Sequence, residues 1–390
     1  MALSPLPFQD PLGDVPFLNL RVELNNPIDG VAAVFRHFLP NGVAGDEERD
    51  VKLNIVELSG GLINRLFRVS HHHQSTDGPY AAALVRLHKT ELPEVFDRDR
   101  ELRIIRFLAS HGLFGQIYGR FENGICYRYQ NGEPLTVDQV AQPDIAIVIA
   151  RTLAHVHAVS RPLVVSEAER TGDCIRRWFN LICSPDFKCL DPFANQRVKE
   201  AFPNLNSIRE EFEVVWSECQ AMMPADHPLV VCHNDLIPAN MILSDSSSSE
   251  PDIRIIDYEF AGIGHQAQEI GYFMSEFVGM DIGEDRYPDL QFQLNFITEY
   301  LKSWYSFTQK GERAVNDDEV WNMYVRATKY SQLRHFACLA GTIAIASRDA
   351  SYSNNVESLG GHDAIWYVLQ NWSWYQRKKE QLQRLDLKPE

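Results

Sequence analysis

Hydrophobic and polar positions alternate differently in two parts of the chain. Between residues 51 and 130, short apolar runs are separated by glycine-rich or polar breaks, a pattern typical of strands joined by turns. One stretch instead places Glu101, Ile105 and Leu108 on one helical face, and Gly112 can end that helix. We therefore predict a small, mainly antiparallel sheet domain with one helix. Its expected elements are strands at 51–58, 66–69, 81–87 and 125–129 and a helix at 98–110.

The rest of the chain has a mainly helical pattern. Apolar residues recur at helical spacing most clearly in 145–159, and helices are also expected at 205–222 and 290–306. Short apolar strands interrupt these helices at 229–232, 241–243 and 253–256. The predicted organisation is an N-terminal extension at 1–50 with a short helix near its end, a first lobe at 51–132 and a second lobe at 133–390.

The charge of the chain narrows the classes of partner. Among 390 residues the formal net charge is -16, and no long basic run occurs. Neutralising nucleic-acid phosphates requires clustered Lys and Arg, and the same is true of adhesion to anionic lipid. We expect no nucleic-acid partner and no membrane insertion.

The cysteines and the first residues point to an intracellular protein. Seven cysteines occur without a CxxC pair, which argues against a zinc ribbon and suits buried, reduced thiols. Residues 1–10 lack the basic and apolar regions of a signal peptide, and no apolar run approaches the roughly 20 residues of a spanning helix. The expected localisation is cytoplasmic.

An aspartate followed five residues later by an asparagine lies on the loop between two expected strands. These residues are Asp235 and Asn240. The spacing is that of a kinase catalytic loop, because phosphoryl transfer needs an aspartate that orients the acceptor hydroxyl and takes its proton, and an asparagine that holds a metal ion at the phosphates. Taken alone, the pattern also fits a turn with an Asx cap.

A second acidic position follows the next apolar strand. Asp257 comes directly after the strand expected at 253–256. A carboxylate at the end of a buried strand is unfavourable unless it is paired or binds a metal, and in kinases this position binds Mg²⁺. Because the two motifs occur in the order found in kinases, with a hairpin between them, they favour phosphoryl transfer over two unrelated turns.

The first lobe contains candidate nucleotide-binding residues. Gly60 and Gly61 in a strand turn can bring backbone N–H groups close to phosphates. Arg86 lies on the third expected strand and can contact phosphate oxygens, while Glu101 on the following helix can pair with it. Each feature alone also fits an ordinary turn or a surface charge. Their order along the chain is what indicates a nucleotide site.

A helix expected at 268–280 supplies candidate acceptor-binding residues. It would place Glu269, Tyr272 or Phe273, and Glu276 on one face. Carboxylates beside aromatic rings suit an ammonium group, through charge and cation–π attraction. The alternative is an ordinary amphipathic helix with solvated acids.

Taken together, these motifs resemble the choline/ethanolamine kinase family. The family pattern of His-Asn-Asp-Leu, then Asn, then Ile-Asp-Phe/Tyr-Glu-Tyr/Phe-Ala-Gly is present at 233–236, at Asn240 and at 256–262. The resemblance extends from about residue 55 to about residue 380. It implies an α+β, two-lobed, protein-kinase-like fold with a small antiparallel-sheet N-lobe and a larger, mainly helical C-lobe.

The resemblance also implies an ATP-dependent small-molecule kinase that uses Mg²⁺ and a small amino alcohol. Asp235 would be the base, Asn240 and Asp257 the catalytic Mg²⁺ ligands, and adenine would lie at the connector that follows the N-lobe. The residues assigned to the nucleotide are Gly60, Gly61, Asn64, Arg86, Glu101, Tyr127 and Tyr129. The residues assigned to the substrate are Asp235, Glu259, Glu276 and Tyr367.

Within the family, the chain is most similar to ethanolamine kinases. The order Asp257-Tyr258-Glu259 and the segment 276–280 resemble those enzymes. They would make phosphoethanolamine for phosphatidylethanolamine biosynthesis. Ala337 and Ala340 stand where the family carries two tryptophans of the aromatic cage for quaternary ammonium, and each lost cation–π contact costs about 0.5–2 kcal/mol. Further departures are Ile63, Gly264, Glu269 and Tyr272.

Several alternative functions follow from these departures. A choline kinase or dual-specificity enzyme is the nearest alternative, because other aromatic residues could rebuild the cage. An aminoglycoside-type phosphotransferase is expected to lack the continuation after Asp257. A nucleotide-binding pseudokinase is disfavoured by intact Asp235 and Asn240. A homodimer is possible within the family.

Overall fold

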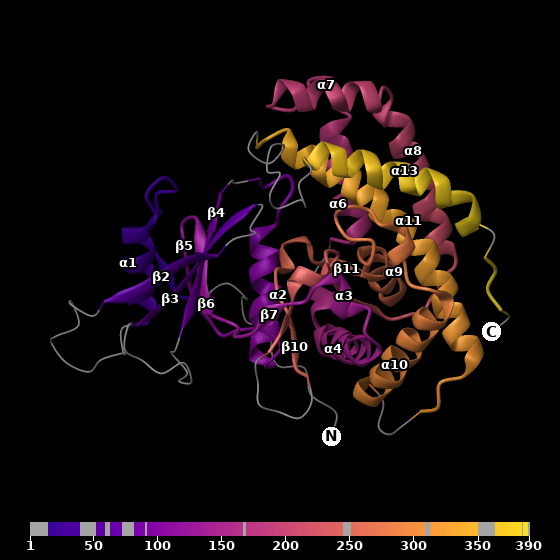
Figure 1. The fold of residues 1–390 in the computed structure, drawn as a ribbon, viewed down its shortest axis with the longest axis horizontal. Helices are drawn as coiled ribbons and strands as arrows, with labels where there is room; N and C mark the ends of the chain where they lie inside the picture. Colours follow the sequence, from indigo (N-terminus) through magenta and orange to yellow (C-terminus); the bar gives the residue numbers. More distant parts are fainter. Residues whose placement is uncertain are drawn as a thin grey trace. The chain divides into compact units, whose positions relative to one another are not determined.

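The computed structural model describes residues 15–39, 52–58, 63–71, 82–89, 92–166, 169–244, 251–308, 313–349, 363–383 and 385–388. They form two compact units, which Figure 1 shows as a sheet-rich part and a helix-rich part. The first unit comprises the described residues of Met1–Glu91 and Arg98–Gln130, and the second those of Leu92–Asp97 and Asn131–Glu390.

The first unit is built on a six-stranded sheet. Its strand order is β1-β5-β6-β4-β3-β2, and β1 runs parallel to β5 while the other neighbours pair antiparallel. The predicted strands and the predicted helix are confirmed, whereas β1 and β5 were not anticipated. The elements are β1 Phe17–Leu18, α1 Ile28–Phe38, β2 Leu53–Leu58, β3 Asn64–His71, β4 Ala83–His88, α2 Arg98–Ser110, β5 Ile117–Phe121 and β6 Gly124–Arg128.

Residues 15–39, which the sequence placed in an extension, take part in the core of this unit. Val31, Val34 and Phe35 of α1 are fully buried against strand residues such as Phe67 and Val85. This packing also accounts for Gly119 in β5. Glycine is unfavourable inside a strand, so its presence made β5 hard to predict from the sequence. A Cβ atom on Gly119 would come within 2.1 Å of the Phe38 ring, so only glycine allows this close approach.

The second unit is mainly helical, as predicted. The helices expected at 145–159, 205–222 and 290–306 are confirmed as α4, α8 and α10. Helix α11 is central, because it contacts α6, α8, α9, α10 and α13 and is buried on most of its surface. The helices are α3 Val137–Val140, α4 Pro143–Ser160, α5 Leu163–Ser166, α6 Thr171–Ile182, α7 Pro192–Ala201, α8 Leu205–Ala221, α9 Gln266–Glu276, α10 Leu290–Thr308, α11 Asp317–Ala346 and α13 Ala364–Gln383.

Two small sheets in this unit bring the two acidic motifs together. The predicted hairpin of β9 (Met241–Leu243) and β10 (Ile253–Ile255) forms, and β7 (Glu133–Pro134) pairs with β9. In addition, β8 (Leu229–Cys232) pairs with β11 (Gly262–His265), a pairing the sequence did not indicate. The last residue of β8, Cys232, pairs with the first residue of β11, Gly262. The start of the loop 233–240 therefore lies beside the end of the segment 256–261.

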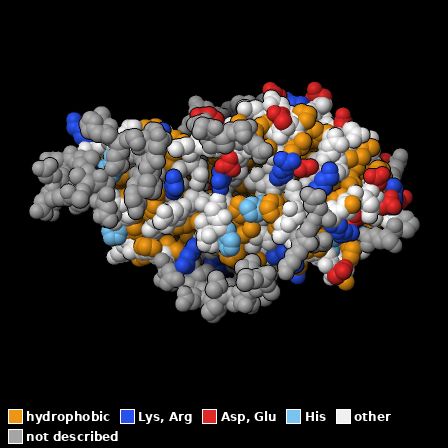
Figure 2. All heavy atoms as spheres, turned by 90° about the horizontal axis from the view of Figure 1, so that it is seen from below, with side chains coloured by type: hydrophobic (Ala, Val, Ile, Leu, Met, Phe, Trp, Pro, Cys, Tyr) orange, Lys and Arg blue, Asp and Glu red, His pale blue; other side chains and the backbone are white. Residues whose placement is uncertain are grey.

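The distribution of charged side chains can be followed on one face of the molecule (Figure 2). On the face drawn in Figure 2, acidic and basic side chains are interspersed with exposed hydrophobic ones. None of the helices within the described residues is both long enough and apolar enough to cross a bilayer.

Candidate active site

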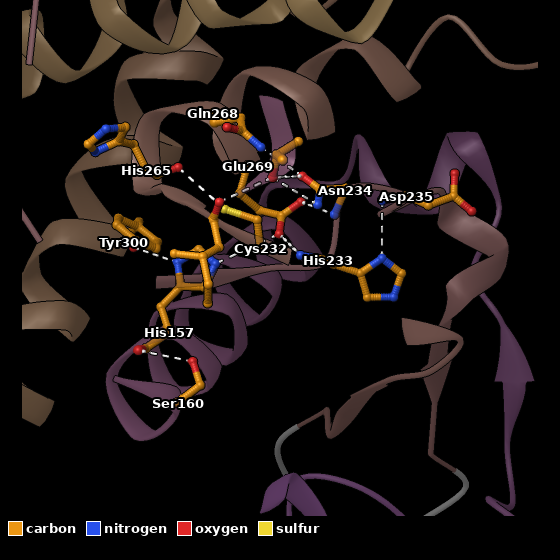
Figure 3. Close-up of polar contacts among 12 residues, drawn as sticks. His157, Ser160, Cys232, His233, Asn234, Asp235, His265, Gln268, Glu269 and Tyr300 are labelled. Atoms are coloured by element: carbon orange, nitrogen blue, oxygen red, sulfur yellow. Dashed lines mark hydrogen bonds and ion pairs between the residues drawn. The ribbon is translucent and has the colours of Figure 1, made fainter. Parts of the chain in front are cut away.

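The loop after β8 is held from behind by a buried carboxylate of α9. Glu269 is fully buried and accepts hydrogen bonds from the backbone N–H groups of His233 and Asn234, the latter at 3.1 Å. Asn234 has a left-handed backbone with φ 65°, and its side chain accepts from Gln268 at 2.7 Å (Figure 3). A short polar side chain tolerates this conformation better than most residues. The bonds fix the direction in which the loop presents its next residue, Asp235.

His233 links this loop to the segment after β10. The backbone N–H of Asp235 donates to His233 Nδ1 at 3.2 Å, so the ring hydrogen lies on Nε2, which donates to the Ile256 carbonyl oxygen at 2.7 Å. The N–H of Ile256 in turn donates to the Asn240 carbonyl oxygen at 2.9 Å. The residue preceding Asp257 is therefore bonded to both ends of the loop 233–240.

Asp235 and Asn240 contact each other directly. Asn240 Nδ2 donates to the Asp235 backbone oxygen at 2.9 Å and to its Oδ2 atom at 3.3 Å. Burial, together with the nearby carboxylates of Glu276 and Glu259, raises the pKa of Asp235 to about 7, although Arg334 and Asn240 act in the opposite direction. In Figure 3 the Asp235 carboxylate points away from Glu269. The geometry thus presents a proton acceptor that titrates near neutral pH.

Asp257 has an unusual backbone conformation. Its φ is 64° and its ψ is 62°, which is the left-handed region, and it stands between β10 and the short 3₁₀ helix η3, Tyr258–Phe260. A non-glycine residue in this region costs free energy, and such residues concentrate at functional sites. Because the Ile256 N–H donates to the Asn240 carbonyl oxygen, Asp257 follows a residue that is bonded to Asn240.

The acceptor side of the site contains an ion pair that the sequence analysis missed. Arg334 of α11 donates through Nε and Nη2 to both carboxylate oxygens of Glu276, with Nη2 at 2.8 Å from Oε2. Arg334 Nη2 also donates to the Tyr367 hydroxyl at 2.7 Å. Arg334 is 7% exposed and Glu276 8% exposed, so the pair is buried. The available signal was a charged residue just before the mainly apolar end of α11, residues 336–346.

These observations agree with the comparisons. A sequence model of the choline/ethanolamine kinase family matches residues 55–357. The chain belongs to the choline/ethanolamine kinase family. Ethanolamine kinase 1 of Mus musculus is 28% identical over 309 residues, covering 79% of this chain and 80% of the relative. Probable ethanolamine kinase A of Dictyostelium discoideum is 26% identical over 306 residues, covering 78% and 81%.

Solved structures of the family share the fold. A Plasmodium vivax ethanolamine kinase superposes with a TM-score of 0.69 at 19% identity, covering 90% of this chain and 89% of that one. A choline kinase from Cryptosporidium parvum Iowa II has a TM-score of 0.66 at 18% identity, covering 91% and 96%. The predicted α+β, protein-kinase-like fold, with a small sheet lobe and a larger helical lobe, is thereby confirmed.

Several residues assigned from the family pattern lie where the site is built. Glu276 and Tyr367 are joined through Arg334, and Glu259 is 6% exposed on η3 directly after Asp257. Glu269, expected to share an acceptor-facing surface with Glu276, instead supports the loop backbone. The aromatic residues expected beside it are core residues, since Tyr272 and Phe273 are buried and Phe273 packs on Phe277 and Phe296.

Helix α11 presents small residues toward this region. Cys338 lies one turn after Arg334, and the charges of Arg334, Glu276 and Asp235 all act on its thiol. A Cβ atom on Gly341, one turn further, would stand 3.2 Å from the Trp178 ring, so an indole from α6 covers that position. Ala337 is partly exposed and Ala340 is fully buried.

The first unit contains the predicted strand–helix ion pair. Arg86 Nη2 lies 2.5 Å from Glu101 Oε1, with Arg86 4% exposed and Glu101 2% exposed. Arg98 also donates to Glu101 at 2.9 Å and reaches the Asn64 amide oxygen at 3.4 Å. Burial by itself would raise the pKa of Glu101, but Arg86, Arg98 and His88 lower it to about 2. The carboxylate therefore stays ionised between two arginines.

The other residues assigned to the nucleotide include two tyrosines of the first unit and the glycine pair. Tyr127 is buried on β6 against Phe114, with ring centroids 5.3 Å apart. The Tyr129 ring carries the Arg68 guanidinium at 4.8 Å from its centroid. Gly60 and Gly61 lie outside the described residues.

Proposed function

We propose that this protein is an ethanolamine kinase, which transfers the γ-phosphoryl group of ATP to the hydroxyl of ethanolamine and forms phosphoethanolamine for phosphatidylethanolamine synthesis. The observation that carries this proposal is the joined pair of segments, with Asp235 and Asn240 bonded to each other and tied to the residue before Asp257. Named relatives with ethanolamine kinase activity and the buried carboxylates around Asp235 support ethanolamine as the acceptor.

Asp235 would act on the acceptor hydroxyl. As a new bond forms between the hydroxyl oxygen and the γ-phosphorus, the bond from phosphorus to the bridging oxygen breaks, ADP leaves, and the hydroxyl proton goes to the Asp235 carboxylate. A pKa of about 7 suits this role, because the group is largely ionised near neutral pH yet still holds a proton well. Asn240 Nδ2 would keep the carboxylate oriented toward the acceptor.

Asn240 and Asp257 fit a Mg²⁺ ion. Asn240 uses its amide nitrogen for Asp235, so its amide oxygen takes part in neither of those bonds and remains a hard oxygen donor. Asp257 follows β10 with a left-handed backbone, and its carboxylate would supply the second oxygen donor. Oxygen-only donor sets are those that Mg²⁺ prefers, and the bound ion would neutralise charge that develops on the phosphates.

The first unit would contribute the phosphate contact through Arg86. Glu101 holds one side of this guanidinium, and Arg98 shares the same carboxylate. Two guanidinium groups are thus gathered at one carboxylate, and guanidinium groups suit the oxygens of a triphosphate. Tyr127 and Tyr129 at the end of the sheet remain our assignment for the adenine.

The decisive experiment is Mg²⁺–ATP turnover with ethanolamine and choline side by side at matched concentrations. We expect phosphorylation of ethanolamine with a clear preference over choline. Equal or better use of choline would reassign the protein as a choline or dual-specificity kinase. No turnover with either acceptor, in protein shown to be folded by circular dichroism, would overturn the proposal.

A further inference from the structure

The buried arginine of the acceptor region uses only part of its hydrogen-bonding capacity. Of the five guanidinium N–H groups, Nε–H and one Nη2–H bind Glu276, and the second Nη2–H binds the Tyr367 hydroxyl. The Nη1 atom is buried and has no hydrogen-bond partner among the described residues. The guanidinium is thus locked on one edge, and it fills space beside the carboxylate assigned to the substrate.

This arrangement changes what Glu276 can offer to a ligand. Both carboxylate oxygens are already bonded to Arg334, and a positive charge lies permanently against them. A primary ammonium can still donate N–H hydrogen bonds to the remaining lone pairs of these oxygens and to neighbouring carboxylates. A trimethylammonium group has no N–H to donate and depends on contact surface and aromatic faces.

Helix α11 offers few aromatic faces beside Arg334 for a trimethylammonium group to contact. The next positions along this side of the helix are Cys338 and Gly341, neither of which has a ring. The hydroxyl of Tyr367 is bonded to Arg334 itself. Trp178 covers Gly341 but packs edge-on against Phe260, with centroids 5.9 Å apart and planes at 87°.

The local charge still favours a cation as ligand. The carboxylate of Glu276 and the guanidinium of Arg334 both lie close enough to Asp235 to act on its charge. The carboxylates of Asp235 and Glu276 and the Arg334 guanidinium therefore lie within electrostatic reach of one another, and an ammonium group bound here meets carboxylates as well as the guanidinium. A small ammonium with hydrogen-bond donors is therefore accepted, while bulk beside Glu276 is not.

We infer that Arg334 is a specificity-determining residue that occupies the ammonium-binding carboxylate Glu276 and thereby selects amino alcohols with a primary ammonium over those with a quaternary ammonium. The inference rests on the proposed function, because it concerns the acceptor of the same reaction. Arg334 acts here as a built-in cation whose size and charge take the place that three methyl groups would need.

The test compares the kcat/KM ratio of ethanolamine to choline in three proteins. Arg334→Ser removes both bulk and charge, Arg334→Lys keeps the charge but not the forked geometry, and Arg151→Ser removes a surface arginine paired with Glu299. We expect Arg334→Ser to lower the ratio by about tenfold or more, mainly through a lower KM for choline, a size typical of steric discrimination in a pocket. Arg334→Lys should lie between wild type and Arg334→Ser, and Arg151→Ser should match wild type.

A ratio of two substrates in one preparation does not depend on the fraction of protein that is folded, so a destabilised variant remains informative. An unchanged ratio in Arg334→Ser, with wild type active on ethanolamine, would overturn the inference and leave the proposed function intact. An equal loss of both substrates in that variant would show that Arg334 has only a structural role, which also overturns it. Failure of wild type on both substrates would instead overturn the proposed function.

Discussion

The Arg86–Glu101 pair of the first unit and the Arg334–Glu276 pair of the second have the same chemistry and opposite surroundings. Glu101 is shared by Arg86 and Arg98, so two guanidinium groups lie against one carboxylate. Arg334 instead lies against Glu276 and the Tyr367 hydroxyl, and Asp235 is within electrostatic reach of Arg334, Glu276 and Glu259. An ion pair alone therefore says little about the ligand; the charges that remain around it decide whether phosphate or ammonium is bound.

The largest effect on turnover should come from replacing Asp235, the proposed base, which lies near the Arg334–Glu276 pair. Asp235→Ala is expected to reduce turnover by about 10²–10⁴-fold, because it removes the carboxylate that we assign as the proton acceptor and that Asn240 Nδ2 orients. ATP affinity should stay close to wild type, since the nucleotide residues are assigned to the first unit. The measurement is steady-state kinetics with ethanolamine alongside nucleotide titration; activity close to wild type would remove Asp235 from the mechanism.

Replacing Glu101 and Glu276 by glutamine, one at a time, should affect the KM values of different substrates. Glu101→Gln removes the carboxylate that is ion-paired with the buried Arg86 and with Arg98, and breaking a buried ion pair typically destabilises a protein by about 3–5 kcal/mol. The KM for ATP should rise as well, whereas the KM for ethanolamine should not. Denaturant unfolding and two-substrate kinetics check this pair of outcomes.

Glu276→Gln provides the opposite half of that comparison. It should raise the KM for ethanolamine and leave the KM for ATP unchanged, because it removes a carboxylate only from the acceptor side. If both variants raised the same KM, the division into a phosphate-binding pair and an ammonium-side pair would be wrong.

The pH dependence of the reaction should report the charges around Asp235. Since burial and two carboxylates raise its pKa to about 7, kcat/KM should fall as the pH drops below that value and the base becomes protonated. Removing negative charge with Glu276→Gln should move this acid limb to lower pH. Removing positive charge with Arg334→Ser should move it to higher pH. Profiles from about pH 5.5 to about pH 8.5 would show either shift.

The same raised pKa predicts a stability effect. In the folded protein Asp235 holds its proton more tightly than in the unfolded chain, where the ordinary value is 3.8, so this group destabilises the fold increasingly as the pH rises from 3.8 to about 7. Asp235→Asn should therefore raise the melting temperature at about pH 8 more than at about pH 5. A larger gain at the lower pH would contradict the sign.

The smallest expected effects are changes in stability when a glycine of either unit, Gly119 or Gly341, is replaced by alanine. Gly119→Ala would force a Cβ atom to 2.1 Å from Phe38, which overpacks the sheet and costs about 1–3 kcal/mol. Gly341→Ala brings a Cβ atom to only 3.2 Å from Trp178, and the gain in helix propensity offsets most of the strain. Thermal unfolding of both variants would measure the difference, and equal destabilisation would show that α11 is as tightly packed as β5.

The sequence by itself determined the local features of this protein. The strands of the first unit, α2, α4, α8, α10 and the β9–β10 hairpin follow from apolar periodicity and turn residues, and the spacing of Asp235, Asn240 and Asp257 indicated the chemistry. These signals are readable because each depends on neighbours within one element or one loop.

Only the tertiary structure decided the environment of the site. The role of Glu269 as a support for the loop backbone, and the capture of Glu276 by Arg334, join residues that are far apart in the sequence. Helix α11 carried no clear period because it is buried on most sides, so its pattern did not tell which face meets α9. Charge balance is a sum over all neighbours in space, and a linear pattern does not contain that sum.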